Sequence, residues 1–245
     1  MKGRGLQMPM DSNTLFAQVL HCLAVLAAFI APALLILIPI RFLTKLPSYV
    51  FRKLLHIVAF SCVTLMILSA RNWQAAALTS VMLAIVFYPI LSAFENASWF
   101  GKLFVQKSAG EIKKSLLLLF FMFAAMITVS WGFFDKPHLA AAAILMWGTG
   151  DAAAALVGIP CGKHKVRSRY TDGKKSWEGS LAMLAVSFIS GMIVLSTAQK
   201  MPLPQAVLSA GLGALLGTAT ELFSPSEYDT VTVPAVIAAV LLLLR

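Results

Sequence analysis

Long apolar blocks separated by short polar segments run along almost the whole chain. Within each block the apolar residues cover all sides of a helix instead of one stripe with a 3.6-residue repeat. A helix that crosses a bilayer needs about 20 mostly apolar residues. The blocks that meet this requirement are Leu15–Ile40, Leu54–Ala70, Trp73–Phe94, Ser115–Phe134, Leu139–Val157, Gly179–Thr197 and Leu203–Phe223. The pattern therefore predicts an all-α fold with at least seven membrane spans.

A shorter apolar block, Val231–Leu244, follows the seventh one. It is either an eighth span or a helix packed against the others. Since no internal repeat, linker or low-complexity tract interrupts the series, we expect a single integral membrane domain over residues 1–245, with residues 1–13 as a short N-terminal tail. The predicted fold is a polytopic transmembrane helix bundle of seven to eight spans.

Composition supports a membrane environment. Of the 245 residues, 59% are hydrophobic and 12% are charged, against about 25% charged residues in typical soluble domains. The net charge of +10 would suggest nucleic acid as the partner of a soluble protein. Here the basic residues lie between apolar blocks, so they indicate membrane topology and anionic phosphate instead, and we expect no nucleic-acid partner.

The basic residues are strongly biased toward alternate connections. Fourteen of the twenty Lys and Arg residues follow the first, third and fifth blocks, whereas three follow the second, fourth and sixth. By the positive-inside rule the first group of connections is cytoplasmic. The segment after the seventh block, with Glu221, Glu227 and Asp229, falls on the same side. This arrangement predicts an active site at the cytoplasmic interface. The compact chain without a transit peptide indicates a bacterial plasma membrane, with the ER membrane of a eukaryote as the alternative.

Asp151 lies at or inside the end of the fifth apolar block, in the stretch Trp147-Gly-Thr-Gly-Asp. An ionisable residue at such a position costs about 3 kcal/mol, which makes it a functional candidate, although it could also simply pair with a nearby lysine.

Glycines and lysines follow Asp151 directly. Gly158 and Gly162 precede Lys163 and Lys165, and Gly150 precedes the aspartate. Glycine-rich turns with lysine suit phosphate, because backbone amides and ammonium groups converge on its oxygens. Small residues also serve helix packing in membranes, which is the better interpretation for Ala152–Ala155.

A second polar stretch opens the sixth block and reads Asp172-Gly-Lys174-Lys175-Ser176-Trp177-Glu178-Gly-Ser180. Two lysines, a hydroxyl and a carboxylate at a helix N-terminus would suit a triphosphate with its magnesium. The alternative is a basic loop that sets topology, with Ser176 as an N-cap and Glu178 favoured by the helix dipole. These residues alone leave both interpretations open.

The remaining candidates lie at the starts and ends of other blocks. Arg52 and His56 are one turn apart on the same face at the start of the second block, where a basic flank with an interfacial histidine explains them better than a functional role does. Glu111 and Glu227 fit capping boxes. Glu221 and Asp229 have no such explanation, so they are candidate metal ligands or bases.

Three motifs, taken in order, resemble the CTP-dependent lipid-alcohol kinases, the family of dolichol kinase, phytol kinase and yeast-type diacylglycerol kinase. The motifs are Arg52-Lys53-x-x-His56, Gly150-Asp151-Ala-x-Ala with Gly158 and Gly162-Lys163, and Lys175-Ser176-x-Glu178-Gly-Ser. The segment Glu221…Asp229-Thr230-x-x-x-Pro234 is similar to a terminal Glu…Asp-Asn-x-x-x-Pro signature of the family, with Thr230 in place of Asn. The resemblance covers roughly Arg52 to Pro234.

The resemblance implies an enzyme that moves the γ-phosphoryl group of CTP, with Mg²⁺ or another divalent cation, onto the hydroxyl of a lipid alcohol from the bilayer (a polyprenol, phytol or diacylglycerol). The candidate catalytic residues are Asp151, Arg52, Lys53, His56 and Asp229. The candidate nucleotide-binding residues are Gly150, Gly158, Gly162, Lys163, Lys165, Lys174, Lys175, Ser176 and Glu178. The candidate metal ligands are Asp151, Glu178, Asp229 and Glu221.

Two other functions are weighed against the kinase. Lys174-Lys175-Ser176-Trp177-Glu178-Gly179 is similar to a signature of phosphatidate cytidylyltransferase, which also uses CTP, but that family's later aspartate-rich segment has no counterpart after Gly211. A membrane transporter would place charges near the middle of several spans and show inverted repeats. Neither is present in this sequence, so the kinase is the favoured prediction.

Overall fold

The computed structural model describes residues 12–44, 46–95, 110–166, 173, 175–225 and 228–245. Helices dominate these residues, and a six-residue π-helix, η1 (Thr128–Phe133), continues α5. The α-helices are α1 (Ser12–Leu43), α2 (Ser48–Ser69), α3 (Trp73–Phe94), α5 (Glu111–Ile127), α6 (Pro137–Cys161), α7 (Trp177–Thr197), α8 (Leu203–Phe223) and α9 (Asp229–Leu243).

The predicted all-α membrane fold is confirmed. Among the described residues, seven helices are long and apolar enough to cross a bilayer, and α5 with η1 counts as one of them. The last apolar block forms α9, which has 15 residues and is therefore shorter than these seven. It packs against α8, α6 and α5.

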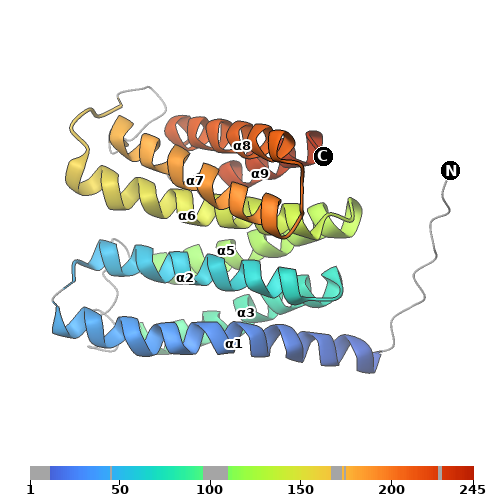
Figure 1. The fold of residues 1–245 in the computed structure, drawn as a ribbon. Helices are drawn as coiled ribbons and strands as arrows, with labels where there is room; N and C mark the ends of the chain where they lie inside the picture. The colour runs from blue at the N-terminus through green and yellow to red at the C-terminus, as the bar shows by residue number, and fades with distance from the viewer. Residues whose placement is uncertain (1–11, 45, 96–109, 167–172, 174, 226–227) are drawn as a thin grey trace.

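The helices lie side by side, and the chain reverses direction at each connection (Figure 1). As a result, α1, α3, α6 and α8 all finish at the same end of the bundle, opposite to the start of α1. Most of the basic residues that the structure describes lie at this end. Helix α6 is central, because it contacts α2 on one side and α7 on the other.

Small residues allow α6 to approach both neighbours closely. A Cβ atom on Gly148 would lie 2.0 Å from the Phe60 ring of α2, and one on Gly150 would lie 2.1 Å from the Ser187 hydroxyl of α7. Near the end of α6, a Cβ on Gly158 would lie 3.3 Å from the Cα atom of Gly179. These contacts bring α6 close to α2 and α7 from its middle to its end. The polar residues at that end of the three helices therefore face one another.

Candidate active site

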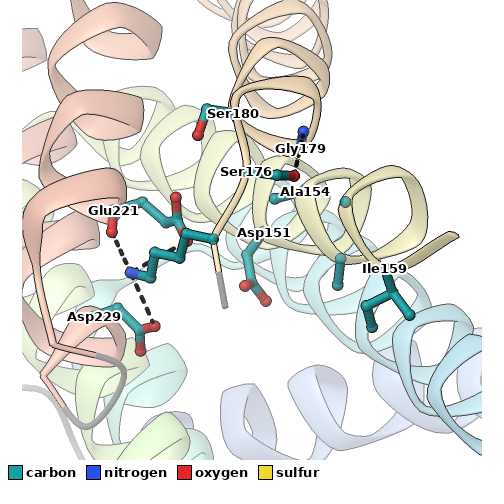
Figure 2. Close-up of a pocket in the computed structure, with 11 residues that line it drawn as sticks. Asp151, Ala154, Ile159, Ser176, Gly179, Ser180, Glu221 and Asp229 are labelled. Carbon is teal, nitrogen blue, oxygen red and sulfur yellow. Dashed lines mark hydrogen bonds and ion pairs between the residues drawn. The ribbon is translucent and has the colours of Figure 1, made fainter. Parts of the chain in front are cut away.

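A pocket opens at the end of the bundle where α6, α7, α8 and α9 meet (Figure 2). Polar side chains and a short apolar stretch of α6 form its walls. The lining residues are Asp151, Ala154, Ala155, Gly158, Ile159, Lys175, Ser176, Gly179, Ser180, Glu221 and Asp229. The pocket thus joins residues that are up to 78 positions apart in the sequence, from Asp151 to Asp229.

Asp151 extends from α6 toward two side chains of α2. The Lys53 ammonium donates a hydrogen bond to Asp151 Oδ2 at 2.6 Å. His56 Nε2 lies 3.2 Å from the same oxygen, outside hydrogen-bond geometry. Only 15% of the Lys53 side chain is exposed. Since a charge in this environment needs a partner, the lysine and the aspartate stabilise each other's ionised forms.

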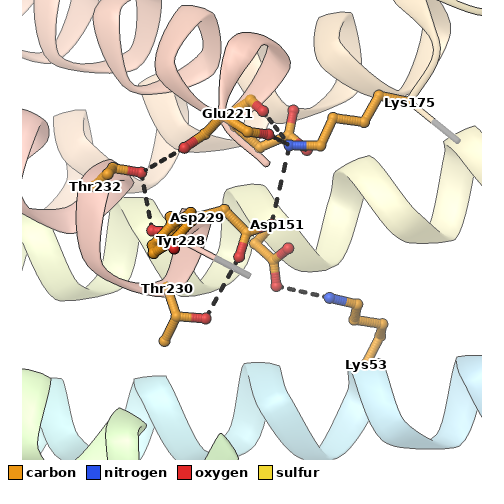
Figure 3. Close-up of polar contacts among 9 residues, drawn as sticks. Lys53, Asp151, Lys175, Glu221, Tyr228, Asp229, Thr230 and Thr232 are labelled. Atoms are coloured by element: carbon orange, nitrogen blue, oxygen red, sulfur yellow. Dashed lines mark hydrogen bonds and ion pairs between the residues drawn. The ribbon is translucent and has the colours of Figure 1, made fainter. Parts of the chain in front are cut away.

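Lys175 forms the second charged cluster together with the α8–α9 corner (Figure 3). Its ammonium lies 3.2 Å from Glu221 Oε1 and 4.0 Å from Asp229 Oδ2. It also donates hydrogen bonds to the carbonyl oxygens of Glu221 and, at 2.9 Å, Ser224. One lysine therefore faces two carboxylates in a place where its side chain is 10% exposed.

Asp229 is the first residue of α9, the helix that is shorter than the seven candidate spans. Burial, reinforced by the neighbouring Asp151 carboxylate, raises the pKa of Asp229 to about 6, although Lys175 acts in the opposite direction. The ionised carboxylate is thus under-stabilised by its surroundings. A further cation in the pocket would favour its ionised form.

The chain on both sides of the α6–α7 connection forms a small hairpin that fixes Lys175. Val166 N donates to the Lys175 carbonyl at 3.0 Å, and Trp177 N donates to the His164 carbonyl at 3.1 Å. Ser176 then caps α7 by accepting a hydrogen bond from Gly179 N at 3.3 Å. The predicted N-cap is confirmed, and it directs Lys175 toward the pocket.

Glu178, a predicted metal ligand, does not line this pocket. Its carboxylate accepts hydrogen bonds from Lys163 N at 3.2 Å and His164 N at 3.1 Å, and it contacts His164 Nδ1 at 2.7 Å. Glu178 therefore ties the residues that follow α6 to the first turn of α7. The sequence places Glu178 in a candidate functional motif but does not predict that its carboxylate accepts these backbone hydrogen bonds.

The predicted glycine-rich phosphate turn also takes a different form. The chain stays helical as far as Cys161, and neither Gly158 nor Gly162 has a positive φ. A Cβ atom on Gly162 would lie 2.5 Å from the Ser176 hydroxyl, so this glycine, like Gly150 and Gly158, permits close packing. Gly158 still lines the pocket. Helical geometry accounts for the difference, because the amides of α6 are bonded within the helix and do not converge on a ligand.

The other predicted site residues lie around the pocket without lining it. Arg52 NH1 lies 3.7 Å from Glu111 Oε1 of α5, and so links α2 to α5. Lys163 and Lys165 are exposed on the hairpin. Lys174 lies outside the described residues. Of the predicted set, the pocket brings together Asp151, Gly158, Lys175, Ser176, Glu221 and Asp229, with Lys53 and His56 adjoining Asp151.

Comparison with known proteins decides the family. The chain is 32% identical over 195 residues to phytol kinase from Synechocystis sp., and the match covers 77% of this chain and 76% of that enzyme. The chain belongs to the lipid-alcohol kinase family. No family model matches it, and no solved structure matches it. It is thus a multi-pass membrane protein of a kinase family, in agreement with the resemblance in its motifs.

Sequence reasoning missed part of this pocket. Ser180, Ala154, Ala155 and Ile159 all line it but were not among the predicted site residues. A signal was present for Ser180, since it follows Ser176 by four positions and so shares its helix face. For the apolar residues of α6 no such signal exists, because alanine and isoleucine occur throughout the spans.

The pocket has the donor chemistry for a magnesium ion. Mg²⁺ prefers oxygen ligands and usually takes one or two carboxylates, with phosphate oxygens and water completing its shell. Asp151, Glu221 and Asp229 supply such carboxylates on the pocket walls. Within the part of the chain that the structure describes, no three His, Cys, Asp or Glu side chains are close enough to hold an ion by themselves. The site therefore fits an ion that arrives with phosphates better than one held by protein ligands alone.

Proposed function

We propose that this protein is a CTP-dependent lipid kinase that transfers the γ-phosphoryl group of CTP to the hydroxyl of a lipid alcohol. The observation that carries the proposal is the convergence of Asp151, Lys175, Glu221 and Asp229 in one pocket at the end of the membrane helices. Phosphoryl transfer needs charge neutralisation and in-line positioning more than covalent chemistry from the protein. Alternating carboxylates and ammonium groups are suited to both tasks.

The lysines would act on the phosphates. In the structure, Lys53 and Lys175 neutralise carboxylates at 2.6 Å and 3.2 Å, respectively. If the carboxylates bound a metal instead, both ammonium groups would become available for phosphate oxygens. Lys163 and Lys165, exposed on the hairpin, would contact the more distant parts of the nucleotide.

Asp151 and Asp229, with Glu221, would hold Mg²⁺. When bound, the ion supplies charge neutralisation at the β- and γ-phosphate oxygens. The proposed ligand set omits Glu178, because its carboxylate is engaged with Lys163 N, His164 N and His164 Nδ1 outside the pocket.

The acceptor would approach along α6. Ala154, Ala155 and Ile159 give the pocket an apolar wall, and the Ile159 side of that wall is exposed. A lipid alcohol lying against it would place its hydroxyl near Asp151, at the depth of the headgroups. His56 and Asp229 are the candidates to accept the hydroxyl proton. A loose transition state demands little of this base.

The test uses purified protein in detergent or vesicles with Mg²⁺ and CTP labelled at the γ-phosphate. The acceptor panel contains phytol, the alcohol named for the related enzyme, a polyprenol and diacylglycerol. We expect label in the lipid phosphate with CTP and much less with ATP. Incorporation of CMP with release of pyrophosphate would instead indicate a cytidylyltransferase, and absence of labelled lipid from every acceptor would refute the kinase proposal.

We further propose that the pocket opens to the cytoplasm, because the basic residues concentrate at its end of the bundle. Cys161, at the end of α6, is exposed, whereas Cys22 and Cys62 are buried. A membrane-impermeant maleimide should therefore label Cys161 in inverted vesicles and leave it unmodified in intact cells. The reverse pattern would place the pocket on the outer side.

A further inference from the structure

Ser180 is a buried serine on the wall of the pocket. It lies in the first turns of α7, lines the pocket and is 5% exposed. Its hydroxyl oxygen has no hydrogen-bond partner among the described residues. Figure 2 shows the hydroxyl on the side of the pocket where Glu221 lies, away from Ile159.

Several other hydroxyls in these helices donate a hydrogen bond to a carbonyl of their own helix. Thr149, Thr197 and Thr220 each donate to the carbonyl four residues earlier, at 2.7, 2.5 and 2.7 Å, respectively. The corresponding acceptor for Ser180 is the Ser176 carbonyl, which receives the Ser180 backbone N–H at 3.0 Å. The Ser180 hydroxyl does not join it.

A buried hydroxyl without a partner destabilises a folded protein, because it has lost its hydrogen bonds to water. Such a hydroxyl therefore contributes nothing to the stability of the fold. When it also lines a pocket, the missing partner is expected to be a ligand that enters the pocket.

The surroundings of Ser180 indicate the chemistry of that ligand. The same end of the pocket holds Lys175, Glu221 and Asp229, which suit phosphate and its counter-cation, whereas Ala154 and Ile159 form the apolar end. We propose that the Ser180 hydroxyl donates a hydrogen bond to a phosphate oxygen of the nucleotide's polyphosphate group. This inference rests on the proposed function, since it assigns a contact within the same site.

The test compares Ser180→Ala with Ser209→Ala. Ser209 is a matched control because it is 1% exposed on α8, its hydroxyl likewise has no partner among the described residues, and it does not line the pocket. Neither change removes a hydrogen bond seen in the structure, so both variants should unfold at the temperature of the wild type or slightly above it. Binding of magnesium tripolyphosphate and of magnesium CTP is then measured by the shift in unfolding temperature as ligand is titrated.

We expect Ser180→Ala to weaken binding of both ligands about tenfold, the scale of one hydrogen bond to a charged group. Ser209→Ala should bind like the wild type, and the KM for the lipid alcohol should be unchanged in both. Wild-type affinity in Ser180→Ala, or a change confined to the lipid KM, would overturn the inference, as would absence of tripolyphosphate and CTP binding by the wild type. If the wild type binds tripolyphosphate but does not phosphorylate lipids, the proposed function fails. The affinities of Ser180→Ala and Ser209→Ala for tripolyphosphate then still show whether Ser180 contacts phosphate.

Discussion

Helices α1 and α6 are both long and apolar, but the structure uses them in opposite ways. The most hydrophobic stretch of α1 has a mean hydropathy of 2.8, and 6% of it is buried inside the protein. The corresponding values for α6 are 1.5 and 44%, and for α8 they are 1.5 and 50%. The least hydrophobic of these helices are thus the most buried, which reverses the usual order in soluble proteins.

The reversal follows from the solvent. Lipid tails are as apolar as leucine, so a helix gains little by hiding large apolar residues from them, and helices associate through close packing and polar contacts instead. Helix α1 carries exposed Phe16, Leu35 and Phe42. Helix α6 carries Gly148, Gly150 and Asp151, which serve packing and the site.

The largest loss of activity should come from replacing Asp151, the carboxylate in α6. Asp151→Asn removes the negative charge that faces Lys53 and the pocket, and we expect the turnover rate to fall at least about a hundredfold. The measurement is lipid phosphorylation at matched amounts of inserted protein. Asp135→Asn is the control, because Asp135 lies before α6 at the other end of the bundle, with φ +54°, a conformation that asparagine tolerates.

Retained turnover in Asp151→Asn would remove this residue from the proposed chemistry. Equal losses in both variants would mean that the two ends of α6 do not differ in function.

A second substitution tests how tightly α6 is packed, for comparison with α1. Gly148→Ala would place a methyl group 2.0 Å from the ring of Phe60, which is fully buried against Phe123 and Trp147 and so has little room to move. We expect a loss of about 1–3 kcal/mol in the free energy of unfolding, the usual cost of overpacking. Thermal unfolding in detergent measures it.

The matched change on α1 is Ala28→Leu, at an exposed position on the outside of the bundle. It should leave the unfolding temperature almost unchanged, because lipid or detergent accommodates the larger side chain. If Ala28→Leu proved as damaging as Gly148→Ala, α1 would have to be packed against protein at that position.

The smallest effect is expected at Glu178, which supports the pocket from outside. Glu178→Ala removes an acceptor from Lys163 N and His164 N, so the hairpin that fixes Lys175 should loosen. We expect the KM for the nucleotide to rise roughly three- to tenfold, as for the loss of one net hydrogen bond. Glu178→Gln keeps an acceptor oxygen and should stay within about twofold of the wild type.

This pair of variants also separates positioning from metal binding. A metal ligand would be damaged by Glu178→Gln about as much as by Glu178→Ala, and would make the apparent affinity for Mg²⁺ fall. That outcome would restore the original prediction for Glu178.

The sequence predicts which charged residues line the pocket, but it does not predict how the pocket is built. Asp151, Glu221 and Asp229 are predicted because a carboxylate at the end of an apolar span has few structural explanations. Lys175 is predicted from its place in the motif that resembles the kinase family. Gly158 and Gly162 were interpreted as a phosphate turn, since glycine permits both a turn and close packing, and only the neighbouring Ser176 and Gly179 show that packing applies. Ser180 was missed because an ordinary serine in a helix is satisfied by its own backbone.

The sequence alone determines the seven long apolar spans, their approximate bounds and the connections in which the charged residues gather. These depend on local properties, namely the length of apolar runs and the position of charges, which the solvent fixes before any helix meets another. The tertiary structure decided which carboxylate faces which lysine, that Glu178 belongs to the hairpin, and that α1 lies outside while α6 is central. These contacts depend on how side chains from distant segments fit together. The sequence of a helix that is apolar on all sides indicates almost nothing about which helices it packs against.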